Sequence, residues 1–123
     1  MRKQYYFRAS ARGLLAWDVD RLVLLSRHLP VRRVPLTQIR ELDATVLGEG
    51  EPLAWRLFVA HVELLDAAEL VYPIILSADG AVMDGMHRVA KALHEGRSHI
   101  DAVQFPEDPD PDHVGYRPEE LPY

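Results

Sequence analysis

Five consecutive residues, Asp84-Gly85-Met86-His87-Arg88, combine the residue types that bind an anion. They follow an apolar run at 72–76 and a turn at 77–80, and they open an amphipathic segment that continues to Glu95. Backbone N–H groups at a helix start lack partners within the helix, and the helix dipole favours negative charge there. Arginine adds a planar fork of donors, and histidine donates hydrogen bonds or moves a proton near neutral pH. The pentapeptide therefore predicts a phosphate site, and a nucleotide is the first ligand to consider.

Each of these residues also has a purely structural interpretation. Asp84 suits the N-cap of a helix, whereas in a phosphate site its carboxylate would hold Mg²⁺. Gly85 could serve only the turn, or its missing Cβ could let a phosphate approach the backbone. His87 and Arg88 could lie on a solvated helix face, since adjacent helical residues reach one ligand only near the helix end. Lys91 either extends the basic strip or pairs with Glu95, four residues later.

Composition limits the class of protein. The chain has 123 residues, 48% hydrophobic and 27% charged, which indicates one globular domain with a core. It has no cysteine, which excludes disulfides and thiol catalysis, and its histidines lack the close spacing of a metal site. The net charge of −5 disfavours nucleic acid as a partner. No apolar run is long enough for a membrane span or a signal peptide, so we expect a cytoplasmic protein with no membrane partner.

The elements that position the pentapeptide follow from hydrophobic periodicity and turn residues. We divide the chain into an N-terminal arm and helix (1–30), a main domain (31–105) and an acidic, proline-rich tail (106–123), together one domain. The expected class is α+β, a small mixed sheet with packed helices. The expected helices are 19–29 with Asp18 as cap, 53–69, and 85–95 with Gly96 as left-handed cap; the expected strands are 31–36, 72–76, 81–83 and 98–105.

Apolar spacing also predicts which side chains are buried. In the helix 53–69, preceded by a loop marked by Gly48, Gly50 and Pro52, one stripe is expected to be core packing: Trp55, Phe58, Val59, Val62 and Leu65. In the helix 85–95 the expected buried face is Met86, Val89, Ala90 and Leu93. The tail is too acidic and proline-rich to bury a core, although its tyrosines and Leu121 could dock on a surface.

The order of these parts carries a resemblance. A strand ending in Val34-Pro35-Leu36-Thr37-Gln38-Ile39 precedes a helix; Pro73-Ile74-Ile75-Leu76, an Asp-Gly hairpin, the pentapeptide and a second helix follow. Over about residues 31–105 the chain resembles the ParB/sulfiredoxin superfamily, the N-terminal-type domain of chromosome-partitioning proteins. The mark of the resemblance is Asp-Gly-x-His-Arg after the hairpin. It implies a sheet-and-helix fold that binds ATP, ADP or CTP with Mg²⁺ at residues 84–88.

Departures from the family's patterns narrow the activity that the resemblance implies. Sulfiredoxins carry a cysteine where this chain has Met86, so their repair of oxidised cysteine is absent. The pair His87-Arg88 matches free serine kinases better than the Arg-Arg version of ParB proteins. We expect no helix-turn-helix region after the domain, which disfavours a complete partition protein.

A kinase-like reaction also needs a carboxylate near the acceptor hydroxyl. In the kinases a Glu shortly after the first strand has that role, and Glu41 and Asp43 lie in that neighbourhood here. Either would act as the base, with His87 as a further catalytic group, and the metal and Arg88 would stabilise the transferred group. Three functions stay open: a small-molecule phosphotransferase, a nucleotide-regulated module that binds a protein partner without catalysis, and a DNA-associated or nuclease role.

Overall fold

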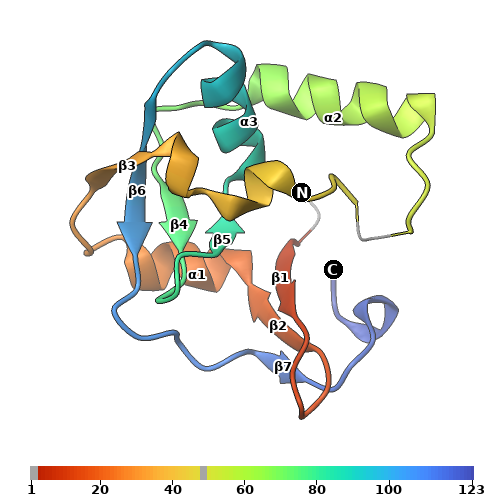
Figure 1. Cartoon of the computed structure of the whole chain (residues 1–123). Helices are drawn as coiled ribbons and strands as arrows, with labels where there is room; N and C mark the ends of the chain where they lie inside the picture. The colour runs from red at the N-terminus through yellow and green to blue at the C-terminus, as the bar shows by residue number, and fades with distance from the viewer. Residues whose placement is uncertain (1–2, 48–49) are drawn as a thin grey trace.

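The computed structural model describes residues 3–47 and 50–123, so Gly48 of the predicted loop and the first two residues of the arm lie outside it. Two sheets and three α-helices make up the described chain (Figure 1). The strands are β1 (Tyr5–Arg8), β2 (Leu15–Asp18), β3 (Arg32–Pro35), β4 (Ile74–Leu76), β5 (Val82–Asp84), β6 (His99–Gln104) and β7 (His113–Val114). The helices are α1 (Val19–Ser26), α2 (Trp55–Ala67) and α3 (Met86–His94), with short 3-10 turns η1 (Leu36–Gln38), η2 (Arg40–Asp43) and η3 (Pro118–Glu120).

The larger sheet has the strand order β3-β6-β4-β5 and is mixed. Strands β3 and β5 run antiparallel to their neighbours, whereas β4 and β6 are parallel. The hairpin between β4 and β5 turns at Asp79-Gly80, with Gly80 at a φ of 90°, as the Asp-Gly pair predicts. The expected α+β class with a small mixed sheet is therefore confirmed.

Strand β4 is buried on both faces and separates two apolar clusters. Ile74 and Leu76 point into a cluster that includes Val89 and Ala92 of α3, whereas Ile75 points into a cluster around Trp17 and Leu22. Successive side chains of a strand point to opposite faces, so a continuous apolar run predicts a strand covered on both sides. The first cluster supports α3, and with it the predicted phosphate site.

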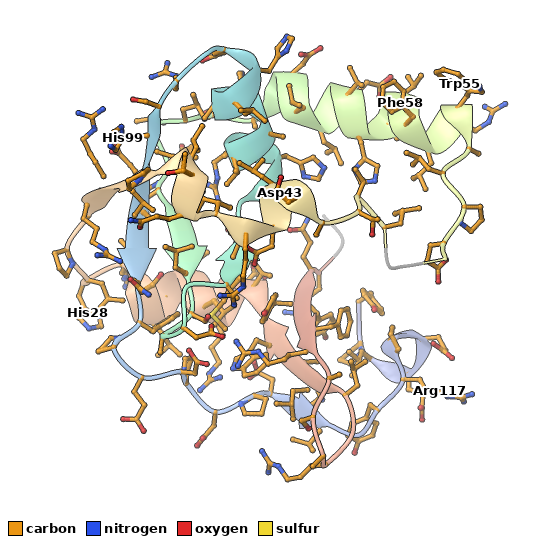
Figure 2. The ribbon with its side chains drawn as sticks, in the orientation of Figure 1. His28, Asp43, Trp55, Phe58, His99 and Arg117 are labelled. Atoms are coloured by element: carbon orange, nitrogen blue, oxygen red, sulfur yellow. The ribbon has the colours of Figure 1, made fainter. Side chains whose placement is uncertain are left out.

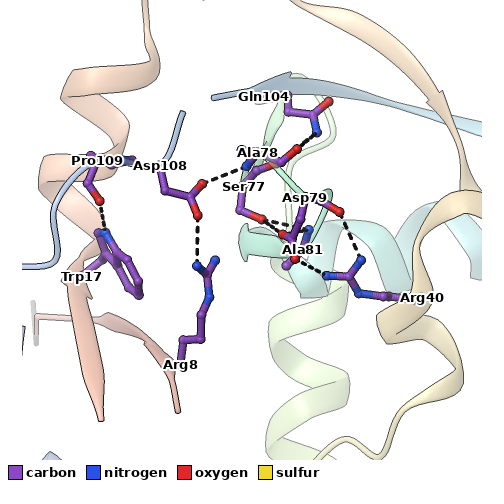
Figure 3. Close-up of polar contacts among 10 residues, drawn as sticks. All are labelled: Arg8, Trp17, Arg40, Ser77, Ala78, Asp79, Ala81, Gln104, Asp108 and Pro109. Carbon is purple, nitrogen blue, oxygen red and sulfur yellow. Dashed lines mark hydrogen bonds and ion pairs between the residues drawn. The ribbon is translucent and has the colours of Figure 1, made fainter. Parts of the chain in front are cut away.

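The smaller sheet joins the two ends of the chain in the order β1-β2-β7. The segment 106–123, expected to be a tail, supplies β7 and η3, and its Leu121 is buried. Figure 3 shows Asp108 between Arg8 and the Ala78 backbone: its two carboxylate oxygens accept a hydrogen bond from each, at 2.9 and 2.8 Å. Acidic residues of this segment therefore bind specific donors of the body of the protein.

The predicted bounds, caps and buried residues are more accurate for some helices than for others. Asp18 caps α1 as predicted, by accepting a hydrogen bond from the Asp20 N–H, but α1 ends at Ser26 rather than Leu29. Helix α3 and the left-handed Gly96 match the prediction, with Val89 buried. The predicted burial of Leu93 is wrong, because α3 turns its Ala92 side, not its Leu93 side, toward the sheet.

Helix α2 contradicts the core prediction. None of its residues is buried, and Trp55 keeps 82% of its surface exposed. In Figure 1, α2 runs along one edge of the molecule, and it packs on α3 rather than on a sheet. Because α3 covers only one side of α2, the part of the predicted stripe that contains Trp55 and Val59 stays exposed. Within the described ranges no helix has the length and apolarity to cross a bilayer.

Candidate functional site

The turn between β5 and α3 is half-buried and leads into a helix start without a side-chain cap. Gly85, not Asp84, is the N-cap residue of α3, and no side chain caps the first turn. Gly85 has a φ of 111°, and a Cβ there would lie 2.6 Å from Ile74 Cγ2. The need for glycine is thus explained by packing under the turn and by left-handed backbone. No side chain of the described residues caps the first amides of α3, as a phosphate site requires.

Asp84 and Arg88 bind each other across this turn. Arg88 Nη2 donates to Asp84 Oδ2 at 2.9 Å, and the two side chains keep only 16% and 23% of their surface exposed. The interpretation of Asp84 as a helix cap is therefore wrong, since its carboxylate binds the guanidinium one turn later. An incoming phosphate would either use the remaining donors of Arg88 or displace Asp84 from it.

His87 forms a pair with a histidine from α2. His61 Nδ1 and His87 Nε2 are 2.9 Å apart, and the two rings stack with centroids 5.2 Å apart. Burial and the neighbouring His61 lower the pKa of His87 below its ordinary value. Which imidazole donates the hydrogen bond to the other depends on the tautomers of the two rings. No local pattern could predict this pair, because 26 positions separate the two residues.

Glu41 lies inside the site, whereas Asp43 lies outside it. Glu41 Oε2 accepts a hydrogen bond from the Val82 N–H of β5 at 2.7 Å, which ties η2 to the larger sheet. Glu41 Oε1 is buried and has no hydrogen-bond partner among the residues that the structure describes. Asp43 is exposed and does not contribute to the cavity described next; Figure 2 shows it on η2.

A cavity of about 420 Å³ lies between η2, the following loop, α2 and α3. Its walls bring together three residues singled out in the sequence, Glu41, Met86 and His87. The other polar members are Thr45 and His61, and the rest of the lining is apolar: Leu42, Ala44, Val46, Leu53, Phe58, Val62, Leu65 and Ala90. The inner side of α2 thus lines a cavity instead of filling a core. The chemistry of this lining suits a molecule with an apolar body and few polar groups.

Lys91 has a role that neither alternative from the sequence included. Its ammonium group donates to the backbone oxygens of Asp66 and Ala68, at 3.0 and 2.7 Å. These carbonyls belong to the C-terminal end of α2, where a positive charge is favourable. Lys91 therefore ties the C-terminal end of α2 to α3.

The donor set near the turn limits how a metal could bind. Across residues 3–47 and 50–123, no cluster of three His, Asp or Glu side chains has a metal-binding arrangement. Mg²⁺ commonly binds through one or two carboxylates together with the phosphates of a substrate. Asp84 can supply one such carboxylate, so the residues fit a metal that arrives with a nucleotide but not a site built from protein ligands alone.

Comparisons with known proteins found no similar protein. No family model, curated protein or solved structure matches the chain, so the resemblance to the ParB/sulfiredoxin superfamily stays a prediction based on the residues themselves.

Proposed function

We propose that the protein binds a nucleotide through its phosphates at the start of α3 and transfers a phosphoryl group to a hydroxyl compound in the adjacent cavity. The observation that carries the proposal is the convergence of Glu41 and His87, from opposite ends of the main domain, on that one cavity. Glu41 also has a buried carboxylate oxygen without a partner, and a buried acceptor in this state favours a donor from a ligand.

The proposed reaction assigns a separate task to each residue. Glu41 accepts the proton of the acceptor hydroxyl as its oxygen forms a bond to the terminal phosphorus. The bond from that phosphorus to the bridging oxygen breaks, and the nucleotide leaves one phosphate shorter, with the electron pair on that oxygen. Arg88 and the uncapped amides of α3 stabilise the charge on the phosphoryl oxygens. Mg²⁺, when bound with the nucleotide, would neutralise part of the phosphate charge.

His87 is assigned to positioning and hydrogen bonding, because its lowered pKa keeps it neutral near pH 7. A neutral imidazole paired with His61 can donate a hydrogen bond to a phosphate oxygen or to the acceptor. The apolar lining favours an acceptor with an apolar body and one hydroxyl over a fully polar one such as serine.

Calorimetry with Mg²⁺ and ATP, ADP or CTP tests the binding step. We expect one of these nucleotides to bind, and Arg88→Ala to weaken it at least tenfold, or about 1.4 kcal/mol, since an arginine–phosphate contact is charge-assisted. Arg97→Ala is the matched control, because Arg97 is an exposed arginine beyond the end of α3. No binding of any of the three nucleotides would overturn the proposal.

Phosphorus NMR with a panel of aliphatic and aromatic alcohols and hydroxy amino acids tests the transfer step. We expect a phosphorylated product with the wild type and loss of most turnover in Glu41→Gln, which cannot accept the proton. Asp43→Asn, two residues away and outside the cavity, should retain activity. Turnover that survives Glu41→Gln would remove Glu41 as the base.

The ion pair between Asp84 and Arg88 favours a second candidate, a nucleotide-controlled binding module without catalysis. A phosphate that takes Arg88 from Asp84 would change the start of α3 and could alter a protein-binding surface. Nucleotide binding with no product from any acceptor would support this candidate. A DNA-associated or nuclease role is disfavoured by the net charge of −5, and a gel shift at moderate salt tests it.

A further inference from the structure

The outer side of α2 is an apolar surface that the rest of the described chain leaves uncovered. Phe58, His61, Val62 and Leu65 line the cavity on the inner side. The outer side carries Trp55, Arg56, Val59, Ala60 and Glu63, which together border a second, open depression of about 520 Å³. Figure 2 shows Trp55 at the far end of α2, away from both sheets. An exposed apolar face of this kind, bordered by charges, marks an interaction surface.

Two opposite charges on this outer side have no partner in the part of the chain that the structure describes. Across residues 3–47 and 50–123, neither Arg56 nor Glu63 forms an ion pair or a side-chain hydrogen bond. They lie seven residues apart, which is two helical turns or about 10 Å along the axis, so they cannot pair with each other. Both charges are therefore available to a partner that presents the opposite charge at the same spacing.

We propose that this partner is a second copy of the same chain, paired through α2 in an antiparallel arrangement. If the two helices cross between Val59 and Ala60, Arg56 precedes the crossing point by the same distance as Glu63 follows it. A two-fold axis at that point places Arg56 of each copy opposite Glu63 of the other, which gives two equivalent ion pairs. A parallel pairing would instead place like charges together.

The apolar residues of the face suit the same register. Val59 and Ala60 meet their equivalents at the crossing point, where the small alanine lets the two helices approach closely. Trp55 lies beside the C-terminal half of α2 in the second copy and loses water-exposed surface. The apolar contact supplies the driving force, and the charges set the orientation. This inference rests on the outer side of α2 alone, so it is independent of the proposed phosphoryl transfer.

Analytical ultracentrifugation over a range of protein concentrations tests the pairing, with the full chain and no nucleotide. We expect a monomer–dimer equilibrium. In a separate fluorescence measurement, the emission of Trp55 should shift to shorter wavelength as the dimer forms. The variant Trp55→Phe distinguishes this emission from that of the buried Trp17. Arg56→Glu and Glu63→Arg should each weaken dimerisation by about tenfold, since symmetry applies every change twice. The double variant Arg56→Glu/Glu63→Arg should restore it.

Restored dimerisation in the double variant would distinguish the proposed antiparallel register from any other way of pairing two copies. Arg97→Glu, a charge reversal at an exposed site outside α2, is the matched control and should leave the equilibrium unchanged. Circular dichroism checks that each variant keeps its fold. A monomer at all concentrations, a dimer indifferent to both single reversals, or a double variant that stays monomeric would each overturn the proposal.

Discussion

The two tryptophans of this protein differ in how much of each side chain the rest of the molecule covers. Trp17 of β2 is 2% exposed, its Nε1–H donates to the Pro109 backbone oxygen at 2.8 Å, and Arg8 lies over its ring. Trp55 of α2 is 82% exposed. Segments from both ends of the chain contact Trp17, whereas α2 packs mainly on α3. An apolar side chain is buried only where distant segments supply a partner, whatever its local spacing.

The largest expected change in stability comes from removing the indole ring of Trp17, and removing that of Trp55 is the comparison. Trp17→Ala should lower the free energy of unfolding by about 3–5 kcal/mol, because it leaves a large cavity in a packed cluster. Trp55→Ala should change it by less than about 0.5 kcal/mol, since an exposed side chain loses little on truncation. Urea unfolding at low protein concentration measures both. Equal losses would show that α2 contributes to the core after all.

A glycine pair tests whether the turn before α3 is constrained by packing. Gly85→Ala should cost about 2–4 kcal/mol, from a left-handed backbone plus the contact of a new Cβ with Ile74. Gly96→Ala is the matched control, because Gly96 also has a positive φ but a Cβ there meets no atom within 4 Å. Chemical denaturation should give the smaller loss for Gly96→Ala. If the two losses are the same, the contact with Ile74 is not the cause.

A substitution in the acidic segment 106–123 should cause a smaller loss of stability. Asp108→Asn should lower stability by about 1–2 kcal/mol, because it weakens charge-assisted hydrogen bonds to Arg8 and to the Ala78 N–H. Asp110→Asn should have little effect, since the Asp110 side chain is exposed and only its backbone oxygen accepts a hydrogen bond. Thermal unfolding of the two variants compares them. A neutral Asp108→Asn would mean that this segment contributes no stability.

The smallest effect is a pH dependence at the contact between α2 and α3. Burial and His61 lower the pKa of folded His87 below 6.5, so the unfolded chain binds a proton more readily. Stability should be constant above the unfolded pKa and should fall as the pH decreases through it. His87→Gln should reduce this slope, whereas His28→Gln, at an exposed site, should not. Denaturation curves at neutral and mildly acidic pH measure it; an unchanged slope in His87→Gln would assign the effect elsewhere.

Elements that depend on short sequence separations were predicted well. The Asp79-Gly80 hairpin, the Asp18 cap and the left-handed Gly96 all arise from backbone preferences within a few residues. The position at which α3 begins was predicted for the same reason. The partners of its side chains were not, because Arg88 binds Asp84 where a helix cap was one interpretation, and His87 binds a residue of another helix.

Helix α2 shows why hydrophobic periodicity alone did not predict which residues are buried. Its apolar residues recur with the spacing of a core helix, and the helix forms close to the expected bounds. Which side would be covered depended on the position of α3 and on the loop that closes the cavity. The resemblance left Glu41 and Asp43 as alternatives for the base. Only the packing of η2 against β5, through the Val82 N–H, brings Glu41 to the same cavity as His87.

The sequence by itself determined the α+β class, most of the helices and strands, and the glycine turn that precedes α3, because hydrophobic periodicity and the conformations of glycine and aspartate act locally. The tertiary structure decided which apolar residues are buried, where the segment 106–123 docks, and which polar atoms lack a partner. Those outcomes depend on contacts between residues far apart in the chain, and such contacts follow from the packing of the whole molecule.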